Sequence, residues 1–159
     1  MIRDFRHGDF EQVARCYERG FPEGHNRYSL SRLIRWFEGE GNGQGTILVA
    51  EEEGVVVGVV IGISTHWRAW MTGLSVLPGH GGFLGLNFVK LLLSLAFRFA
   101  TLGYTEAYAT TARMNMKVLA DRVGAELLRE EQDFFFDGRS RWLYRVDLGY
   151  LSRFQHLLG

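Results

Sequence analysis

Residues 74–85 have the sequence Leu74-Ser75-Val76-Leu77-Pro78-Gly79-His80-Gly81-Gly82-Phe83-Leu84-Gly85. We expect a β-strand over residues 67–76 to lead into this stretch. Pro78 closes that strand, because proline has no amide hydrogen to donate within a sheet. The long apolar segment at residues 83–102 then follows the glycines and is typical of a buried helix. The sequence therefore predicts a strand, a glycine-rich turn and a helix in direct succession.

The glycine cluster has the properties of an anion-binding turn. Glycines let backbone amides come close to a diphosphate because they carry no Cβ atom. A helix that begins just beyond them adds its unpaired N–H groups and the positive end of its dipole. Residues 79–85 combine both features. A plain strand-to-helix turn would have the same sequence, so both interpretations stay open at this point.

The apolar segment at residues 83–102 has to be tested as a membrane span. Lys90 and Arg98 interrupt it and leave too few uncharged residues between them to cross a bilayer. Its polar residues recur every three or four positions, at Asn87, Lys90, Ser94, Arg98 and Thr101. Such a narrow polar stripe predicts a helix that is covered on most sides. The leucines expected to be buried are Leu91, Leu92 and Leu95.

Outward from this stretch, β-branched and periodic runs predict the remaining elements. The expected strands are residues 1–5, 46–50, 55–64, 67–76, 105–111, 133–136 and 142–146. The expected helices are residues 10–17, 30–37, 83–102 and 116–123, with a short helix at 151–158. Asp9 and Gln12 resemble a capping box at the start of the first helix. Asp137-Gly138 predicts a hairpin turn between the last two strands.

The composition narrows the functional class. Hydrophobic residues make up 47% of the chain and charged residues 23%, which is ordinary for a globular domain. Lys plus Arg and Asp plus Glu both number 18, so the net charge argues against a general nucleic-acid binder. Cys16 is the single cysteine, and we expect it to be an unreactive residue that packs in the interior. No signal peptide or metal site is recognised, and a cytoplasmic protein is expected.

The order of these elements and three local motifs resemble the GNAT superfamily of N-acetyltransferases. The best match is Leu74-Ser75-Val76-Leu77-Pro78 before the glycines. Leu102-Gly103-Tyr104 before a strand and residues 119–125 resemble later family segments, and the likeness covers about residues 1–147. It implies an α/β (α+β) GNAT fold in one domain, residues 1–159. That fold has a mixed, mostly antiparallel central sheet with helices on both faces.

The resemblance also implies a cofactor, acetyl-CoA or another acyl-CoA, and its binding positions. In the family, the strand before the glycine turn splays from its neighbour and offers backbone groups to the pantetheine arm and thioester. By position that role falls on Leu74, Ser75 and Val76, and Asn115 is expected near the arm. The candidates for the diphosphate are Gly79, His80, Gly81, Gly82, Phe83, Leu84 and Gly85. The family's basic or amide residue is missing from this turn, and His80 is the expected substitute.

Two catalytic features of the family are absent. A carboxylate often serves as general base on the strand before the proline, but Gly73 stands near that position. A tyrosine on the last helix often protonates the leaving thiolate, and Ala120 takes its place. The loop between the first two helices lines the acceptor side in the family. His25 and Glu23 in that loop are therefore the candidates for proton removal, with water as the alternative.

Three functions remain open on the sequence. The first is N-acyltransfer from acetyl-CoA to a small-molecule or peptide amine, by direct attack in a ternary complex. The second is an inactive GNAT-fold module that holds acyl-CoA or serves regulation. The third is transfer of longer acyl chains, which the apolar residues Phe83 and Leu84 favour. We expect no nucleic-acid partner and no membrane span, and a homodimer is compatible with the chain.

Overall fold

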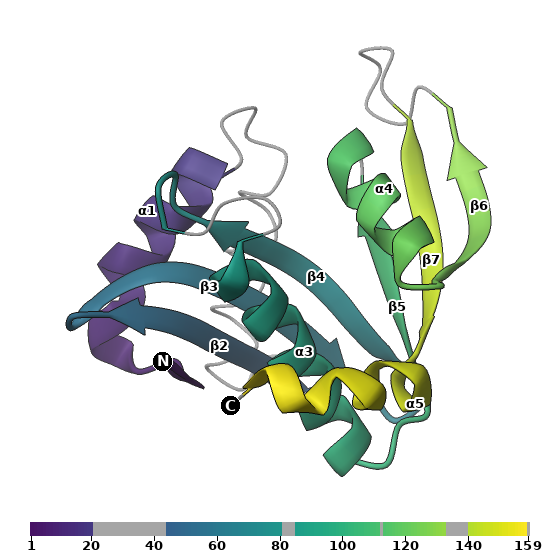
Figure 1. The fold of residues 1–159 in the computed structure, drawn as a ribbon, viewed down its shortest axis with the longest axis horizontal. Helices are drawn as coiled ribbons and strands as arrows, with labels where there is room; N and C mark the ends of the chain where they lie inside the picture. The colour runs from purple at the N-terminus through teal and green to yellow at the C-terminus, as the bar shows by residue number, and fades with distance from the viewer. Residues whose placement is uncertain (21–43, 81–84, 112, 133–139, 159) are drawn as a thin grey trace.

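The structure is a computed structural model that describes residues 1–20, 44–80, 85–111, 113–132 and 140–158 (Figure 1). The strands are β1 (Ile2–Asp4), β2 (Gln44–Glu52), β3 (Val55–Ser64), β4 (Ala69–Val76), β5 (Glu106–Thr111), β6 (Glu126–Glu131) and β7 (Arg141–Asp147). The α-helices are α1 (Phe10–Gly20), α3 (Leu86–Thr101), α4 (Met114–Arg122) and α5 (Leu148–Leu151). Short 3₁₀ helices span His7–Asp9 and Ser152–Leu158. The helix expected at residues 30–37 lies outside the described residues.

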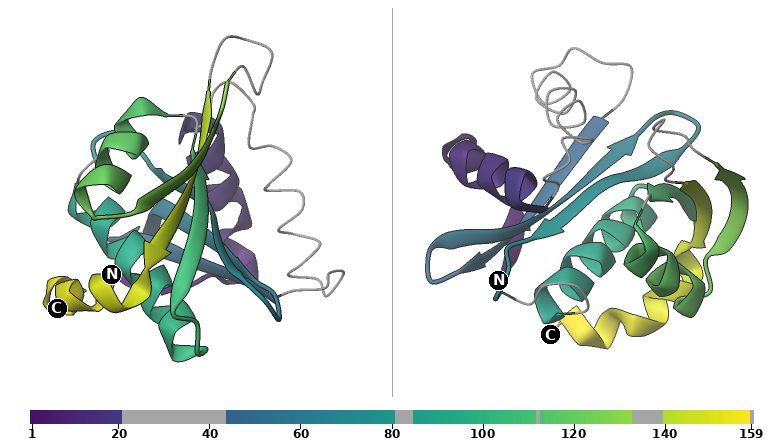
Figure 2. Two further views of the ribbon diagram at one scale, coloured as in Figure 1. Left: turned by 90° about the vertical axis from the view of Figure 1, so that its right-hand side faces the viewer. Right: turned by 90° about the horizontal axis from the view of Figure 1, so that it is seen from above.

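The described strands form one sheet in the order β1-β2-β3-β4-β5-β7-β6. Neighbouring strands are antiparallel except β4 and β5, which run parallel. Helix α1 lies on one face of the sheet and α3 on the other, as the two views of Figure 2 show. The predicted mixed, mostly antiparallel sheet with helices on both faces is thus confirmed.

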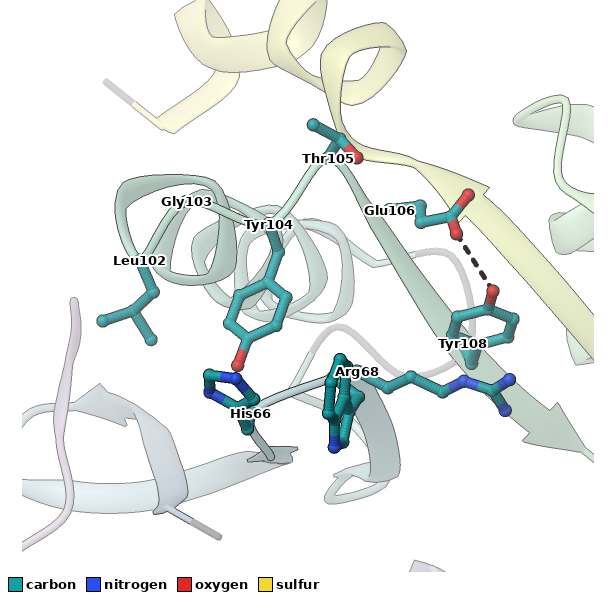
Figure 3. A pocket seen from close by; sticks show the side chains of 9 residues that line it. His66, Arg68, Leu102, Gly103, Tyr104, Thr105, Glu106 and Tyr108 are labelled. Atoms are coloured by element: carbon teal, nitrogen blue, oxygen red, sulfur yellow. Dashed lines mark hydrogen bonds between the residues drawn. The ribbon is translucent and has the colours of Figure 1, made fainter.

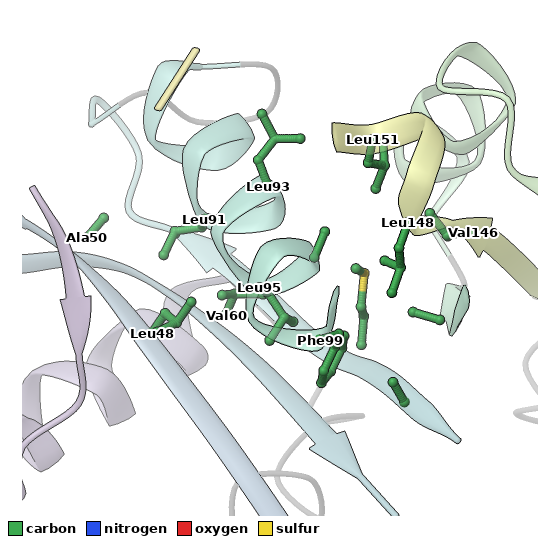
Figure 4. Packing of buried hydrophobic residues seen from close by; sticks show 14 of the residues in the cluster. Leu48, Ala50, Val60, Leu91, Leu93, Leu95, Phe99, Val146, Leu148 and Leu151 are labelled. Atoms are coloured by element: carbon green, nitrogen blue, oxygen red, sulfur yellow. The ribbon is translucent and has the colours of Figure 1, made fainter. Parts of the chain in front are cut away.

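Strand β3 is buried from Val56 to Ser64 because helices cover both of its faces. A strand in that position is a continuous apolar run rather than an alternating one. At Gly62, an added Cβ would lie 2.6 Å from both Leu95 and Phe99 of α3. Glycine is therefore required there for the close approach of α3 to the sheet (Figure 4).

The faces of α3 differ in part from the predicted ones. Leu91 and Leu95 are fully buried as expected, but Leu92 is only half-buried and Leu93 is buried instead. The reason is α5, whose Leu148 and Leu151 belong to the same apolar cluster as Leu93 (Figure 4). Among the polar-stripe residues of α3, Arg98 and Thr101 are exposed and the others are half-buried. No described helix combines the length and apolar character that a membrane-spanning segment needs.

Helix α1 packs on the opposite face of the sheet and contacts β4 closely. Val13, Cys16 and Tyr17 join a second apolar cluster with residues of β2 and β3. The Ser75 hydroxyl donates a 2.7 Å hydrogen bond to the backbone carbonyl of Cys16. A Cβ added at Gly73 would lie 1.8 Å from the Tyr17 hydroxyl oxygen. The C-terminal half of β4 is thereby held against α1.

The last hairpin begins earlier than predicted. Its first strand is β6, Glu126–Glu131, which pairs with β7 from Glu126↔Arg145 to Glu131↔Arg141. The strand expected at residues 133–136 and the turn at Asp137-Gly138 lie outside the described residues. The sequence signal was weak because β6 is exposed along almost its whole length and so lacks a buried alternating face.

The predicted capping box of Asp9 and Gln12 was wrong about the partner of Asp9. Asp9 Oδ2 accepts a 2.7 Å hydrogen bond from the Arg6 amide, so Asp9 caps the turn that starts before it. Gln12 does not complete the predicted box, because its Oε1 accepts the Val56 amide at 2.8 Å. Asp9 is buried and forms a two-pronged ion pair with Arg3, at 2.7 and 2.9 Å. This ion pair fixes the entry into α1.

The Asp9 ion pair predicts a pH-dependent stability. The hydrogen bond from Arg3 is the main reason that the pKa of Asp9 is below its ordinary value of 3.8. A lowered carboxyl pKa stabilises the fold above the unfolded pKa, and the contribution is lost as the pH falls through the folded pKa. Asp9→Asn should therefore be less stable than wild type at pH 7, with a smaller difference at about pH 3. Urea unfolding at both pH values measures this. A difference that stays constant with pH would contradict it, and Asp4→Asn is the control for an exposed carboxylate.

The contact of Tyr17 with Gly73 predicts that even one methyl group is harmful there. Gly73→Ala should lower the free energy of unfolding by about 1–3 kcal/mol, the usual cost of overpacking a filled site. Adding Tyr17→Phe should restore part of the loss because it removes the nearest atom. Gly8→Ala, where an added Cβ meets nothing within 4 Å, is the control. Equal stability of Gly73→Ala and wild type in urea unfolding would refute the contact.

Candidate active site

Strands β4 and β5 separate at the point where the family resemblance expects the acyl donor. They pair only at Trp70↔Tyr108 and Met71↔Ala109. Strand β4 continues to Val76 and stays paired with β3 on its other edge. Figure 1 shows β4 and β5 diverging toward their C-terminal ends. Within the described chain, the β5-facing edge of β4 beyond Met71 therefore has no strand partner and can offer backbone groups to a ligand.

The side chains of the predicted thioester-binding strand are engaged in contacts with the two helices that cover the sheet. Ser75 is 5% exposed and its hydroxyl is bound to α1. Leu74 and Val76 are half-buried and pack against the apolar cluster on the α3 face. Consequently this part of β4 can present its backbone rather than a side chain, and the ligand-binding role of these three residues stays a prediction.

The residues after β4 form a tight turn. The His80 amide donates to the Leu77 carbonyl at 3.1 Å, and Gly79 has a φ of +84°. A type II turn favours proline at its second position and requires a positive φ at its third, which glycine adopts readily. Residues 81–84, which include the predicted contacts Gly81, Gly82, Phe83 and Leu84, lie outside the described residues. Gly85 then precedes α3 and provides no side-chain cap for its first amides.

His80 is held by a carboxylate. Its Nδ1 lies 2.8 Å from Oε2 of Glu52, the last residue of β2. The Asn87 side-chain amide donates to the other Glu52 oxygen at 2.6 Å and to the His80 carbonyl at 2.9 Å. We call Glu52, His80 and Asn87 the Glu52 clasp. It joins His80, which follows β4, and Asn87, in the first turn of α3, to the last residue of β2.

The position expected for a general base is filled by a residue that the sequence did not single out. Tyr17 reaches from α1 to the place where a side chain at Gly73 would stand. Burial raises the pKa of Tyr17 above the ordinary tyrosine range, so its hydroxyl keeps its proton at neutral pH. The only sign of this in the sequence was Gly73 itself, because a glycine at the family's base position leaves space that another side chain can fill. Tyr17 itself looked like one more residue of an apolar helix face.

The other predicted residues are placed only in part. Asn115 lies in the first turn of α4, and the role of its side chain stays a prediction. His25 and Glu23 lie outside the described residues, so their catalytic roles also stay predictions. Ala120 of α4 stands where the family often has a tyrosine. At the next residue, Asp121 accepts a 3.1 Å hydrogen bond from the Tyr144 hydroxyl of β7. Burial, followed by the hydrogen bond to Asp121, raises the pKa of Tyr144 to about 12.

A separate cavity of about 320 Å³ lies at the other end of β4 and β5 (Figure 3). His66, Trp67 and Tyr104 are among its lining residues. The Tyr108 hydroxyl donates to Glu106 at 3.0 Å, and the Arg68 guanidinium lies 5.0 Å from the Tyr108 ring centre. Because the cavity adjoins the N-terminal ends of both strands, it is distant along them from the turn at Gly79. It is not part of the candidate active site.

Solved structures of acetyltransferases have the same fold. An N-acetyltransferase from Staphylococcus aureus Mu50 is 19% identical, with a TM-score of 0.73 over 93% of this chain and 98% of that one. A ribosomal-protein-alanine N-acetyltransferase from Brucella melitensis is 17% identical, with a TM-score of 0.71 over 92% and 99%. A GNAT family acetyltransferase from Elizabethkingia anophelis with acetyl-CoA bound is 11% identical, with a TM-score of 0.71 over 92% and 97%.

The sequence itself matches the family model described as "Acetyltransferase (GNAT) family" at residues 10–120, more than half of the chain. No curated protein matches the chain by sequence. The GNAT family uses acetyl-CoA, which confirms the predicted enzyme class and cofactor at the level of the family. The chain belongs to the acetyltransferase (GNAT) family, as the order of its elements and the strand before its glycine turn predicted.

Proposed function

We propose that the protein transfers the acetyl group of acetyl-CoA to an amine by direct attack in a ternary complex. The observation that carries the proposal is the end of β4–β5 pairing after Met71↔Ala109. It leaves a backbone edge beside the turn at Gly79 and the N-terminus of α3. The backbone edge suits a thioester and its arm. The turn and the helix N-terminus suit a diphosphate.

The chain's own groups would hold the acyl donor. Backbone amides near Leu74, Ser75 and Val76 would face the pantetheine arm and the thioester oxygen. The turn at Gly79 and His80, with the first amides of α3, would face the diphosphate. The donor supplies an activated acyl carbon. The amine nitrogen bonds to that carbon, the carbon–sulfur bond breaks, and the departing thiolate takes up a proton.

Direct attack is supported by the state of Cys16. Cys16 is the only cysteine of the sequence and is fully buried. Burial raises the pKa of its thiol to about 11, and its sulfur lies 3.8 Å from the Val56 carbonyl oxygen. A buried protonated thiol is a poor nucleophile because the thiolate is the reactive form. A covalent acyl-cysteine step is therefore disfavoured.

Proton removal is the demanding step for this chain. A lysine-type ammonium has an ordinary pKa of about 10.4, so most of the acceptor is protonated at neutral pH. Tyr17 occupies the place near Gly73 and keeps its own proton, so no base is provided from β4 at that position. We propose that His25, Glu23 or ordered water accepts the proton. Because a proton-transfer group contributes about 10²–10⁴-fold, turnover of simple amines should be slow.

Thiol release from acetyl-CoA tests the activity. The amine panel should include an aminoglycoside, because an aminoglycoside 6'-N-acetyltransferase from Enterococcus faecium has the same fold with a TM-score of 0.74. It should also include a peptide that offers the amine of an alanine, because the name of the Brucella melitensis enzyme mentions a ribosomal-protein alanine. We expect amine-dependent release whose rate rises with pH as the free amine fraction grows. Incubation without amine measures background hydrolysis. Calorimetry with CoA is run in parallel, and absence of binding at millimolar CoA would reject the proposal. Binding without release for any amine would identify an acyl-CoA-binding module instead.

A further inference from the structure

The cavity at the N-terminal ends of β4 and β5 lies between two turns that are bonded to each other (Figure 3). One turn joins β3 to β4 and contains Thr65, Trp67 and Arg68, and the other joins α3 to β5 and contains Tyr104. The Thr65 hydroxyl accepts the amides of Trp67 and Arg68 at 3.3 and 3.1 Å. The Tyr104 hydroxyl donates to the Thr65 carbonyl and so ties the two turns together. These bonds hold the walls of the cavity in place before any ligand arrives.

The cavity lining contains an arginine and a glutamate whose charges are balanced differently. Glu106 accepts the Tyr108 hydroxyl at 3.0 Å and lies 3.8 Å from Nε of Arg145, a cation that it shares with Glu126. The Arg68 guanidinium lies 5.0 Å from the centre of the Tyr108 ring and forms no ion pair within the described part of the chain. The glutamate thus has a hydroxyl donor and a cation beside it, whereas the arginine has only an aromatic face. The charge that remains uncompensated in the cavity is positive.

Apolar and aromatic surface accompanies this charge. Trp67 and Leu102 both line the cavity, and they are 82% and 47% exposed. The His66 ring packs edge-on against Trp67, with ring centres 4.8 Å apart. An exposed indole that is fixed in this way offers a face on which another ring can stack. The cavity therefore combines a surface for a ring with a cation from the neighbouring residue of the same turn.

We propose that this cavity binds a small aromatic carboxylate, at a site separate from the candidate active site. The carboxylate pairs with the Arg68 guanidinium, whose planar fork of N–H donors matches two oxygens, and the ring lies against Trp67. The volume of about 320 Å³ falls within the range of small-molecule sites, about 300–1,000 Å³. Because the two turns are already bonded together, little conformational freedom is lost on binding. The inference does not depend on acetyl transfer, since neither Gly79 nor the free edge of β4 lines the cavity.

A titration with benzoate, followed through the NMR signals of the tryptophan indole N–H groups, tests binding. We expect millimolar benzoate to shift the signal of Trp67, which is assigned by its absence from Trp67→Phe. Benzamide has the same ring without the charge, and acetate has the charge without the ring. Benzamide should bind about tenfold more weakly than benzoate, the usual effect of losing hydrogen bonds to a charged group, and acetate should also bind more weakly. Absence of a shift with benzoate, or equal binding of benzamide, would refute the proposal.

Variants of the arginine test its role directly. Arg68→Gln should weaken benzoate binding about tenfold, and Arg68→Lys, which keeps the charge but not the fork, should lie between Arg68→Gln and wild type. Arg15→Gln removes an exposed arginine of α1 that does not line the cavity, and should bind benzoate as wild type does. The Thr65 hydroxyl holds the turn through backbone amides, so Arg68→Gln should keep the midpoint of urea unfolding. Wild-type benzoate affinity in Arg68→Gln would overturn the assignment.

Two further titrations decide where the ligand binds and which charge governs the cavity. Millimolar CoA should leave the affinity for benzoate unchanged, and loss of benzoate binding would place the ligand in the candidate active site and refute the separate one. Benzylamine that binds more tightly than benzoate would mean that Glu106 governs the cavity, which also contradicts the proposal. Wild type that binds benzoate beside Trp67 but does not bind CoA would reject the acetyltransferase proposal and support this site.

Discussion

The end of hydrogen bonding between β4 and β5 is the constraint on which the candidate active site depends. Parallel strands that stay paired present no free backbone between them, because every amide and carbonyl is used in the ladder. Here the ladder consists of Trp70↔Tyr108 and Met71↔Ala109 and then stops, while β3 continues to pair with the other edge of β4. Strand β4 thus remains a strand but has one unused edge.

Such an edge has to be rigid to be useful, and both faces of the sheet contribute to that. On one face α1 is bound to β4 through Ser75 and packs Tyr17 against Gly73. On the other face α3 approaches β3 closely over Gly62. Helix α3 is in turn covered by Leu148 and Leu151 of α5. A backbone donor held in this way needs no reorganisation when charge develops near it.

The same packing leaves no space for a carboxylate side chain at Gly73. Because the Tyr17 hydroxyl fills the space at Gly73, a carboxylate there would require α1 to move away from β4. The close contact of α1 is therefore incompatible with a general base at that position. In the proposed reaction, the acceptor for the proton therefore has to come from another part of the chain or from water.

The sequence alone determined the fold class, the family and the turn after β4. The apolar run of β3, the helical period of α3 and the Pro78-Gly79 pair are local patterns, and local patterns follow from backbone geometry that each residue carries with it. The sequence also showed that Gly73 and Ala120 lack the family's side chains. These conclusions needed no knowledge of what packs against what.

Only the tertiary structure decided which groups meet. Tyr17 and Gly73 are far apart in the chain, as are Glu52 and Asn87, and no periodicity links them. The burial of Leu93 in place of Leu92 depends on α5, which follows much later. Strand β6 was missed because an exposed strand has no buried face to mark it. Contacts between distant residues depend on how the elements are placed in space, and a local pattern does not contain that information.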